Sequence, residues 1–353
     1  MTAMIVQALS PEHRSQDLAS MRDSPRRLRQ SRYDLHELPM SPTYHARTHI
    51  SAHSMQQRLT PGTALLLTVP PFLWAGNAVV GRMVGGLVPP LTLNFLRWLV
   101  AFVFLAPFAG RVLHPSSGLW AHWRRFALLG LFGVGCYNAL QYLALKTSTP
   151  LNVTLMAASI PIWMLCVGRL FFGQQITGRQ WVGTALSIAG VLLVLCRGHW
   201  TALAQFHLVA GDLYMLVAAF GWALYSWLLM RTREPARWRN DWSAFLVAQI
   251  AFGLLWSGVF SAGEWALTGA HIVWGWPLVT ALLYVGLGPA ILAYCCWGLG
   301  VQRVGPNIAG FFANLAPLFA ALMSAAFLGE WPQLYHGEAF ALIVGGIVVA
   351  SRR

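Results

Sequence analysis

The stretch TPLNVTLMAASIPIWMLCVGRLFFGQQITGRQWVGTALSIAG, residues 149–190, occurs twice in the chain, because residues 305–346 repeat its pattern at an offset of 156 positions. The coinciding pairs include Pro150 with Pro306, Pro161 with Pro317, Gly173 with Gly329, and Gly190 with Gly346. Proline and glycine set backbone geometry, so a repeat that keeps them preserves bends and close helix contacts after other side chains have diverged. The sequence therefore predicts a duplicated structural unit.

Each copy contains an apolar run of about 23 residues, at 150–172 and 306–328, with a proline near its middle. At roughly 1.5 Å per residue, each run can cross a hydrocarbon core of about 30 Å and is predicted to be a membrane-spanning helix. Pro161 and Pro317 lack an amide donor and leave the carbonyl four residues earlier without its helical partner. Interrupted helices at corresponding positions of two halves are typical of the substrate site of a secondary transporter, so both prolines are predicted hinges.

The composition indicates a membrane protein. Of the 353 residues, 57% are hydrophobic and 10% are charged, and the mean hydropathy is +0.55. The net charge of +13 resembles that of a nucleic-acid-binding protein, but seven Arg lie within the first fifty residues and most others lie between apolar runs. A lipid bilayer, and no nucleic acid, is therefore the expected partner. The five Cys lie in apolar runs without metal-ligand or disulfide spacing, so no metal and no cofactor is expected.

From residue 61 onward, apolar runs alternate with short polar breaks. Ten spans are predicted, at about 63–82, 91–109, 124–144, 150–172, 179–196, 210–230, 243–262, 275–299, 306–328 and 334–350. Because five spans per half is an odd number, the second half must enter the membrane from the opposite side. The predicted fold is an all-α integral membrane protein, with ten transmembrane helices as two inverted five-helix repeats at 62–197 and 210–351.

The remaining segment and the loops complete this topology. Residues 1–60 are polar and basic and are predicted to be a disordered tail; the alternative is that translation begins at Met40 or Met55. With a cytoplasmic N-terminus, the inner loops carry eleven cationic side chains and the outer loops three. Since cationic loops face the cytoplasm, both termini are expected there. Arg97 and Arg169, inside spans two and four, are expected to extend to the lipid headgroups.

Polar and aromatic residues inside the spans fall on helix stripes that predict a central cavity. Trp74 and Asn77 share a stripe on the first span, and at an offset of 148 they match Trp222 and Tyr225. The predicted substrate-binding residues are Trp74, Asn77, Asn138, Gln141, Tyr142, Thr154, Trp222, Tyr225, Tyr294 and Asn314. Because polar side chains are costly in lipid, these faces are expected to point at one another. Hydrogen bonding between helices is the alternative role for each residue taken singly.

Carboxylates in this part of the chain are confined to loops and span ends. They are Asp212, Glu234, Asp241, Glu264, Glu330 and Glu338. A proton relay or cation site usually needs an intramembrane carboxylate, so coupling to an ion gradient has no obvious carrier. The alternative function, an integral-membrane enzyme of lipid or isoprenoid metabolism, would be expected to show clustered Asp or His, and the sequence has no such cluster. No catalytic residue is therefore predicted.

Two blocks resemble a known family. FLWAGNAVVGR at 72–82, followed by PPLTLNFLRW at 89–98, resembles the opening of the EamA-type family of the drug/metabolite transporter (DMT) superfamily, and the segments around Pro161 and Pro317 resemble its repeated half. The resemblance covers about residues 62–350. It implies ten helices in two inverted repeats and transport of amino acids or other small metabolites, often outward across a bacterial inner membrane.

Within the opening motif, Trp74, Asn77 and Arg97 match the family most closely. The family's Gly-Glu pair after the fourth span of each half is present at 329–330, but the first half has Gly173 followed by Gln174. The first half therefore lacks the glutamate that the family has at this position. The expected protein is a multi-pass inner-membrane transporter, a monomer or homodimer, that moves a small-molecule substrate by alternating access.

Overall fold

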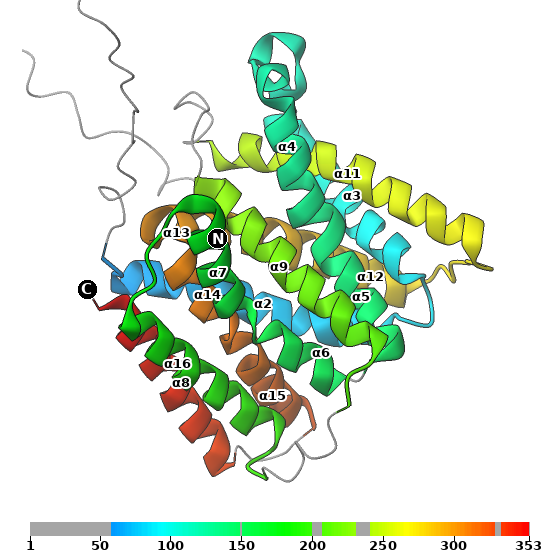
Figure 1. The fold of residues 1–353 in the computed structure, drawn as a ribbon. Helices are drawn as coiled ribbons and strands as arrows, with labels where there is room; N and C mark the ends of the chain where they lie inside the picture. The colour runs from blue at the N-terminus through cyan, green and yellow to red at the C-terminus, as the bar shows by residue number, and fades with distance from the viewer. Residues whose placement is uncertain (1–57, 149, 200–206, 231–240, 329–332, 353) are drawn as a thin grey trace, which may run out of the picture. The chain divides into compact units, whose positions relative to one another are not determined.

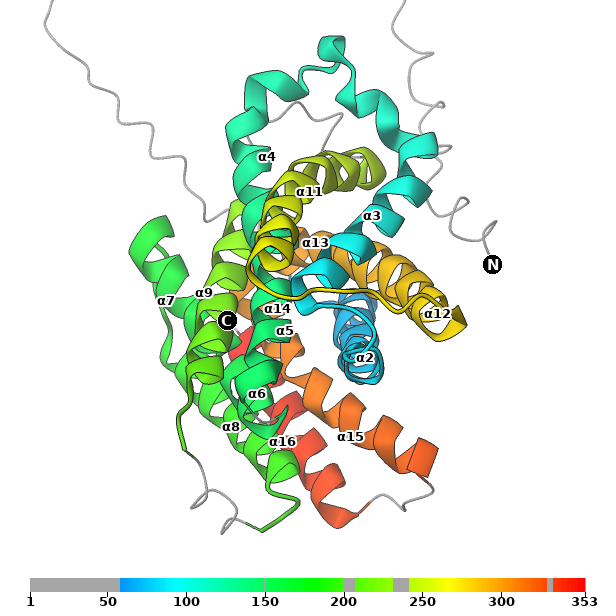
Figure 2. The same ribbon diagram turned by 90° about the vertical axis from the view of Figure 1, so that its right-hand side faces the viewer.

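The computed structural model describes residues 58–352 apart from 149, 200–206, 231–240 and 329–332, and the described residues belong to one compact unit. Most of the expected disordered tail and the Gly-Glu pair at 329–330 lie outside them. Within the described residues, every regular element is helical and ten helical stretches are long and apolar enough to cross a membrane (Figure 1, Figure 2). The predicted all-α membrane class and the number of spans are confirmed.

The spans follow the predicted order, and their ends differ from the prediction by a few residues. They are α2 (Pro61–Met83), α3 (Pro90–Ala109), α4 (Trp123–Leu129) with η5 (Gly130–Cys136) and α5 (Tyr137–Thr147), α6 (Pro150–Ala157) with α7 (Ile160–Phe172), α8 (Gly178–Leu195), α9 (Ala210–Met230), α11 (Trp242–Leu267), α12 (Trp276–Val285) with η7 (Gly286–Leu292) and α13 (Ala293–Val304), α14 (Pro306–Ala313) with α15 (Leu315–Leu328), and α16 (Leu334–Ser351). Short 3-10 turns connect α3 to α4.

Local sequence explains several helix ends. Pro90 occupies the first turn of α3, where its missing amide costs nothing. Thr177 and Gln180 form a capping box at the start of α8, and the side chain of Asp241 accepts a hydrogen bond from the first turn of α11. Gly173 ends α7 with a φ of +66°, a left-handed conformation that favours glycine. These signals are local, so the sequence places the helices well.

The fourth and ninth spans are both interrupted four residues before their central prolines. The helix α6 ends at Ala157 and α14 ends at Ala313, which are equivalent positions of the two halves. Proline alone does not produce the interruption, because α2 runs through Pro70 and Pro71 without a break. The surrounding helices must therefore contribute to keeping these two spans bent.

The third and eighth spans share a second irregularity. Each contains a π-helical segment, η5 or η7, and the two segments coincide at the offset of 156 residues. Such segments widen the helix and are frequent at functional sites. The carbonyl of Gly133 in η5 accepts a hydrogen bond from the Tyr294 hydroxyl, and the equivalent carbonyl of Pro289 in η7 accepts one from the Trp74 indole at 3.3 Å. Each half therefore supplies a donor to the widened helix of the other.

Equivalent helices of the two halves pack against each other in antiparallel pairs. The helices α8 and α16 lie side by side (Figure 1, Figure 2), with Gly183 beside Gly346 and Gly190 beside Ala339. A Cβ on either Gly183 or Gly346 would lie 2.6 Å from the carbonyl oxygen of the other, so only glycine permits this approach. The pairing is reciprocal, as expected for two halves related by a twofold axis.

The second antiparallel pair is α3 with α11. Thr92 near the start of α3 contacts Ser261 near the end of α11, and Phe95 lies against Gly258. Other contacts cross between the halves in matching ways, because α5 and α7 pack on α9 while α13 and α15 pack on α2. Antiparallel packing of equivalent helices is what an inverted repeat requires. The two halves therefore enclose a common centre.

Candidate functional site

A cavity of about 100 Å³ lies where the two interrupted spans meet α2 and α5. Seven of the predicted site and hinge residues line it: Trp74, Asn77, Asn138, Gln141, Thr154, Asn314 and Pro317. Ala157 and Ala313, the last residues of α6 and α14, also line it. Each interruption brings one helix C-terminus and one helix N-terminus to this region, so the backbone there can supply both acceptors and donors.

The other predicted residues lie behind the cavity wall. Tyr142, Trp222, Tyr225 and Tyr294 are each at most 5% exposed, and like Pro161 they do not line the cavity. Sequence reasoning missed Tyr137, which does line it. Its position next to Asn138, one residue before the predicted stripe, was the available signal.

The aromatic residues form one cluster that supports the wall. The ring of Trp222 lies 5.2 Å from that of Trp74, 5.0 Å from Tyr137, 5.0 Å from Tyr225 and 5.5 Å from Tyr294, centroid to centroid. Trp74 and Tyr137 line the cavity, and Trp222 packs behind both. Edge-to-face and tilted arrangements of this kind are favourable and hold the rings in place. The cavity therefore has an aromatic wall that is backed by a second layer of rings.

Asn314 lies at the interruption between α14 and α15 and forms part of the polar wall. It is 1% exposed, and its Nδ2 donates a hydrogen bond to Ser187 Oγ at 2.9 Å. Ser187 belongs to α8, at the contact between α8 and α16. The polar group at the interruption is thus anchored to the antiparallel helix pair.

The structure corrects one expectation. Arg97 does not extend to the lipid headgroups; its side chain is 0% exposed, and Nη1 donates to Asn77 Oδ1 at 3.4 Å and to the Tyr142 hydroxyl at 3.3 Å. The face of α3 that bears Arg97 packs inside the bundle, so the side chain meets polar groups of α2 and α5 in place of lipid. Arg169, by contrast, is exposed in the last turn of α7, as expected for a residue that reaches the headgroups.

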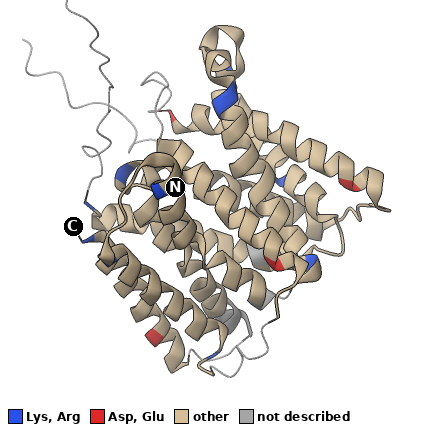
Figure 3. Ribbon diagram, in the orientation of Figure 1, with Lys and Arg blue, Asp and Glu red and all other residues tan. Residues whose placement is uncertain are grey.

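The described carboxylates lie at span ends, as the sequence predicts. Asp212 in the first turn of α9 accepts hydrogen bonds from Ser148, Asn152 and the backbone of Val209. Glu264 near the end of α11 accepts three hydrogen bonds from the first turn of α3. Figure 3 shows that most of the described ribbon carries no charged residue. Both buried carboxylates therefore cap helices.

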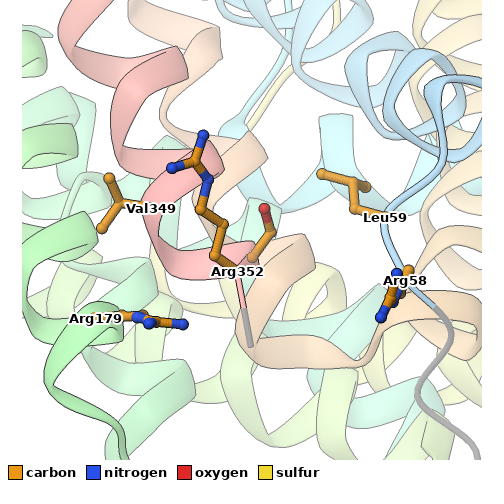
Figure 4. A pocket seen from close by; sticks show the side chains of 6 residues that line it. Arg58, Leu59, Arg179, Val349 and Arg352 are labelled. Atoms are coloured by element: carbon orange, nitrogen blue, oxygen red, sulfur yellow. The ribbon is translucent and has the colours of Figure 1, made fainter.

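A larger surface hollow of about 610 Å³ lies apart from these residues. Arg58, Leu59, Arg179, Val349, Ser351 and Arg352 line it, beside the start of α2 and α8 and the end of α16 (Figure 4). None of the predicted substrate-binding residues belongs to it. The smaller cavity is the candidate site, because it combines the two helix interruptions with the polar and aromatic stripes.

Comparison with known proteins agrees with this architecture. The profile of the EamA-like transporter family matches residues 62–196 and 209–352. A solved crystal structure aligns with a TM-score of 0.63 and 22% sequence identity, covering 82% of this chain and 96% of that one. At 22% sequence identity, this similarity shows that the two chains share a fold.

Curated relatives carry transporter names. An uncharacterized transporter of Archaeoglobus fulgidus is 26% identical over 82% of this chain and 98% of its own length. The aromatic amino acid exporter YddG of Ancylobacter novellus is 27% identical over 79% of this chain and 93% of its own length. The uncharacterized inner membrane transporter YedA of Escherichia coli is 25% identical, over 79% and 87% respectively.

Proposed function

Because this chain belongs to the EamA-like transporter family, we propose that it carries amino acids or related small metabolites outward across the inner membrane by alternating access. The observation that carries the proposal is the convergence of both helix interruptions on one cavity with a neutral polar and aromatic lining. In secondary transporters, substrate sites of this kind lie between two repeats. The name of the YddG relative, an aromatic amino acid exporter, supports amino acids as the first class to test.

Alternating access gives the half-helices a mechanical role. The cavity of about 100 Å³ is smaller than the roughly 300–1,000 Å³ typical of sites for drug-sized ligands, so the site must widen to admit an aromatic amino acid. The interruptions at Ala157 and Ala313 are positions where each span can bend without breaking further backbone hydrogen bonds. We propose that Pro161 and Pro317 keep these positions bendable while one set of helices moves against the other.

Transport assays on reconstituted protein test this function. Asn314→Ala and Asn77→Ala each remove a polar group of the cavity wall. A buried hydrogen bond to the bound or moving substrate is worth about 1.5 kcal/mol, so each variant should reduce the flux of amino acids per folded protein by about tenfold or more. Asn94→Ala is the matched control, since Asn94 is buried and hydrogen-bonded but does not line the cavity.

The control variant, Asn94→Ala, should lose stability but retain its apparent affinity for substrate. Undiminished flux of every amino acid tested in both cavity variants would exclude the cavity as the transport site. A loss of flux that only matches the loss of folded protein would exclude the cavity as well.

A further inference from the structure

Arg97 brings a full positive charge into the protein interior. It is the eighth residue of α3, and its side chain is 0% exposed. The partners of Nη1 are neutral, Asn77 and Tyr142, and among the described residues Nε and Nη2 have no hydrogen-bond partner. A buried charge is costly unless it is paired, and a charged group at such depth is by default functional. An anionic partner for this guanidinium is therefore expected.

The described carboxylates of the chain do not supply that partner. Asp212 and Glu264 are held by hydrogen bonds at the starts of α9 and α3, Asp241 caps α11, and Glu338 is exposed on α16. The hydrogen bonds of Arg97 all go to α2 and α5, away from these groups. Among the described residues, therefore, no carboxylate pairs with Arg97.

Arg97 and Tyr142 fix the orientation of the Asn77 side-chain amide. A guanidinium can only donate, so the Asn77 atom that faces it must be the oxygen. The Tyr142 hydroxyl donates to the same Oδ1 at 3.1 Å. Rotating the amide by half a turn would set its NH₂ group against the Arg97 guanidinium, which has no acceptor, and that arrangement is unfavourable. The Nδ2 amino group is therefore left for the cavity, which Asn77 lines.

We propose that Asn77 Nδ2 binds a carboxylate of the transported solute, and that Arg97 is a positioning residue that orients this amide and supplies positive charge behind it. The inference rests on the proposed transport function and narrows its substrate class to carboxylates. Hydrogen bonds that involve an ionised group are shorter and stronger than neutral ones, so the acid should be preferred over its neutral amide. Tyr142 completes the arrangement as the second donor to Asn77 Oδ1.

The test compares L-phenylalanine with L-phenylalaninamide, which differ in the carboxylate that the site would bind. Binding to the purified full chain and flux in proteoliposomes are measured for wild type, Arg97→Gln and Asn77→Asp. The matched control is Arg169→Gln, which removes the same charge from an exposed position. Asn77→Asp places a carboxylate beside Arg97 and so pairs the buried charge; we therefore expect it to fold even where Arg97→Gln does not.

Wild type and Arg169→Gln should bind the acid at least about tenfold more tightly than the amide, a ratio that corresponds to about 1.4 kcal/mol. Both site variants should bring this ratio close to one, a change in selectivity that loss of stability alone would not produce. A wild-type ratio near one with flux of both compounds, or a ratio unchanged in both site variants, overturns the carboxylate site and leaves the transport function standing. Absence of binding and flux in wild type for both compounds and for every other amino acid tested refutes the transport proposal and the site together.

Discussion

A single added methyl group at Gly346 should weaken the contact between the two halves. A Cβ there would lie 2.6 Å from the carbonyl oxygen of Gly183 and 3.1 Å from the amide of Ser187, whereas ordinary van der Waals contact begins near 3.4 Å. Both are backbone atoms in a helix and cannot rotate away, so α8 and α16 must separate by several tenths of an ångström. Overpacking of this kind costs about 1–3 kcal/mol.

The neighbouring residue provides the control. A Cβ on Gly345, in the same helix, meets nothing within 4 Å. Each Gly→Ala change gains about 0.5–1 kcal/mol of helix propensity, so comparing Gly346→Ala with Gly345→Ala cancels that gain and leaves the packing cost. We expect Gly345→Ala to match or exceed wild-type stability and Gly346→Ala to be less stable than Gly345→Ala by about 1–3 kcal/mol.

Thermal unfolding of the detergent-solubilised protein, followed by tryptophan fluorescence, measures the difference. At about 2–4 °C per kcal/mol for chains of a few hundred residues, Gly346→Ala should unfold several degrees below Gly345→Ala. It should also reduce flux, because the added methyl presses on Ser187, which holds the Asn314 amide at the cavity. Equal melting temperatures for the two variants would show that α8 and α16 do not pack as closely as the structure indicates.

Two further changes test the interruption and the helix caps. Pro317→Ala restores an amide that can donate to the carbonyl of Ala313, so it should favour a continuous ninth span by about 1–3 kcal/mol. We expect slower transport in proteoliposomes and no decrease in melting temperature, and wild-type flux would contradict the hinge role. Glu264→Gln removes the charged acceptor of the backbone amides of Leu91 and Thr92, which lie 3.2 and 2.8 Å from its carboxylate oxygens. We expect the free energy of unfolding to fall by about 1.5–3 kcal/mol, and an unchanged melting temperature would rule out the capping role.

Part of the candidate site could be predicted because its signals repeat along the chain. The polar stripes that include Asn77, Asn138 and Asn314 line the same cavity, as their spacing on the helices indicated. Trp222 and Tyr225 have the same stripe spacing but pack behind the wall. Helical periodicity tells which residues share a face, not which neighbour covers that face. The division between cavity lining and supporting cluster therefore needed the three-dimensional arrangement.

The surroundings of the charged side chain of Arg97 likewise could not be predicted from the sequence. Its position well inside a span was visible in the sequence, and extension to the headgroups is the usual outcome for a long cationic side chain. The structure instead turns it toward Asn77 and Tyr142, which come from two other helices. Packing between segments far apart in the sequence decides which residues come within reach of the guanidinium, and the sequence does not show that packing.

The sequence by itself determined the number of spans, their approximate ends and the positions of the two equivalent interruptions. Hydrophobicity, proline and glycine act locally, and a bilayer requires each apolar run to satisfy its own backbone as a helix. Tertiary structure decided that the helix containing Pro70 and Pro71 stays continuous, and which buried polar groups meet at the cavity. In lipid, most of the inward and most of the outward helix surface is apolar, so the neighbours of a given side chain are fixed only when the helices pack together.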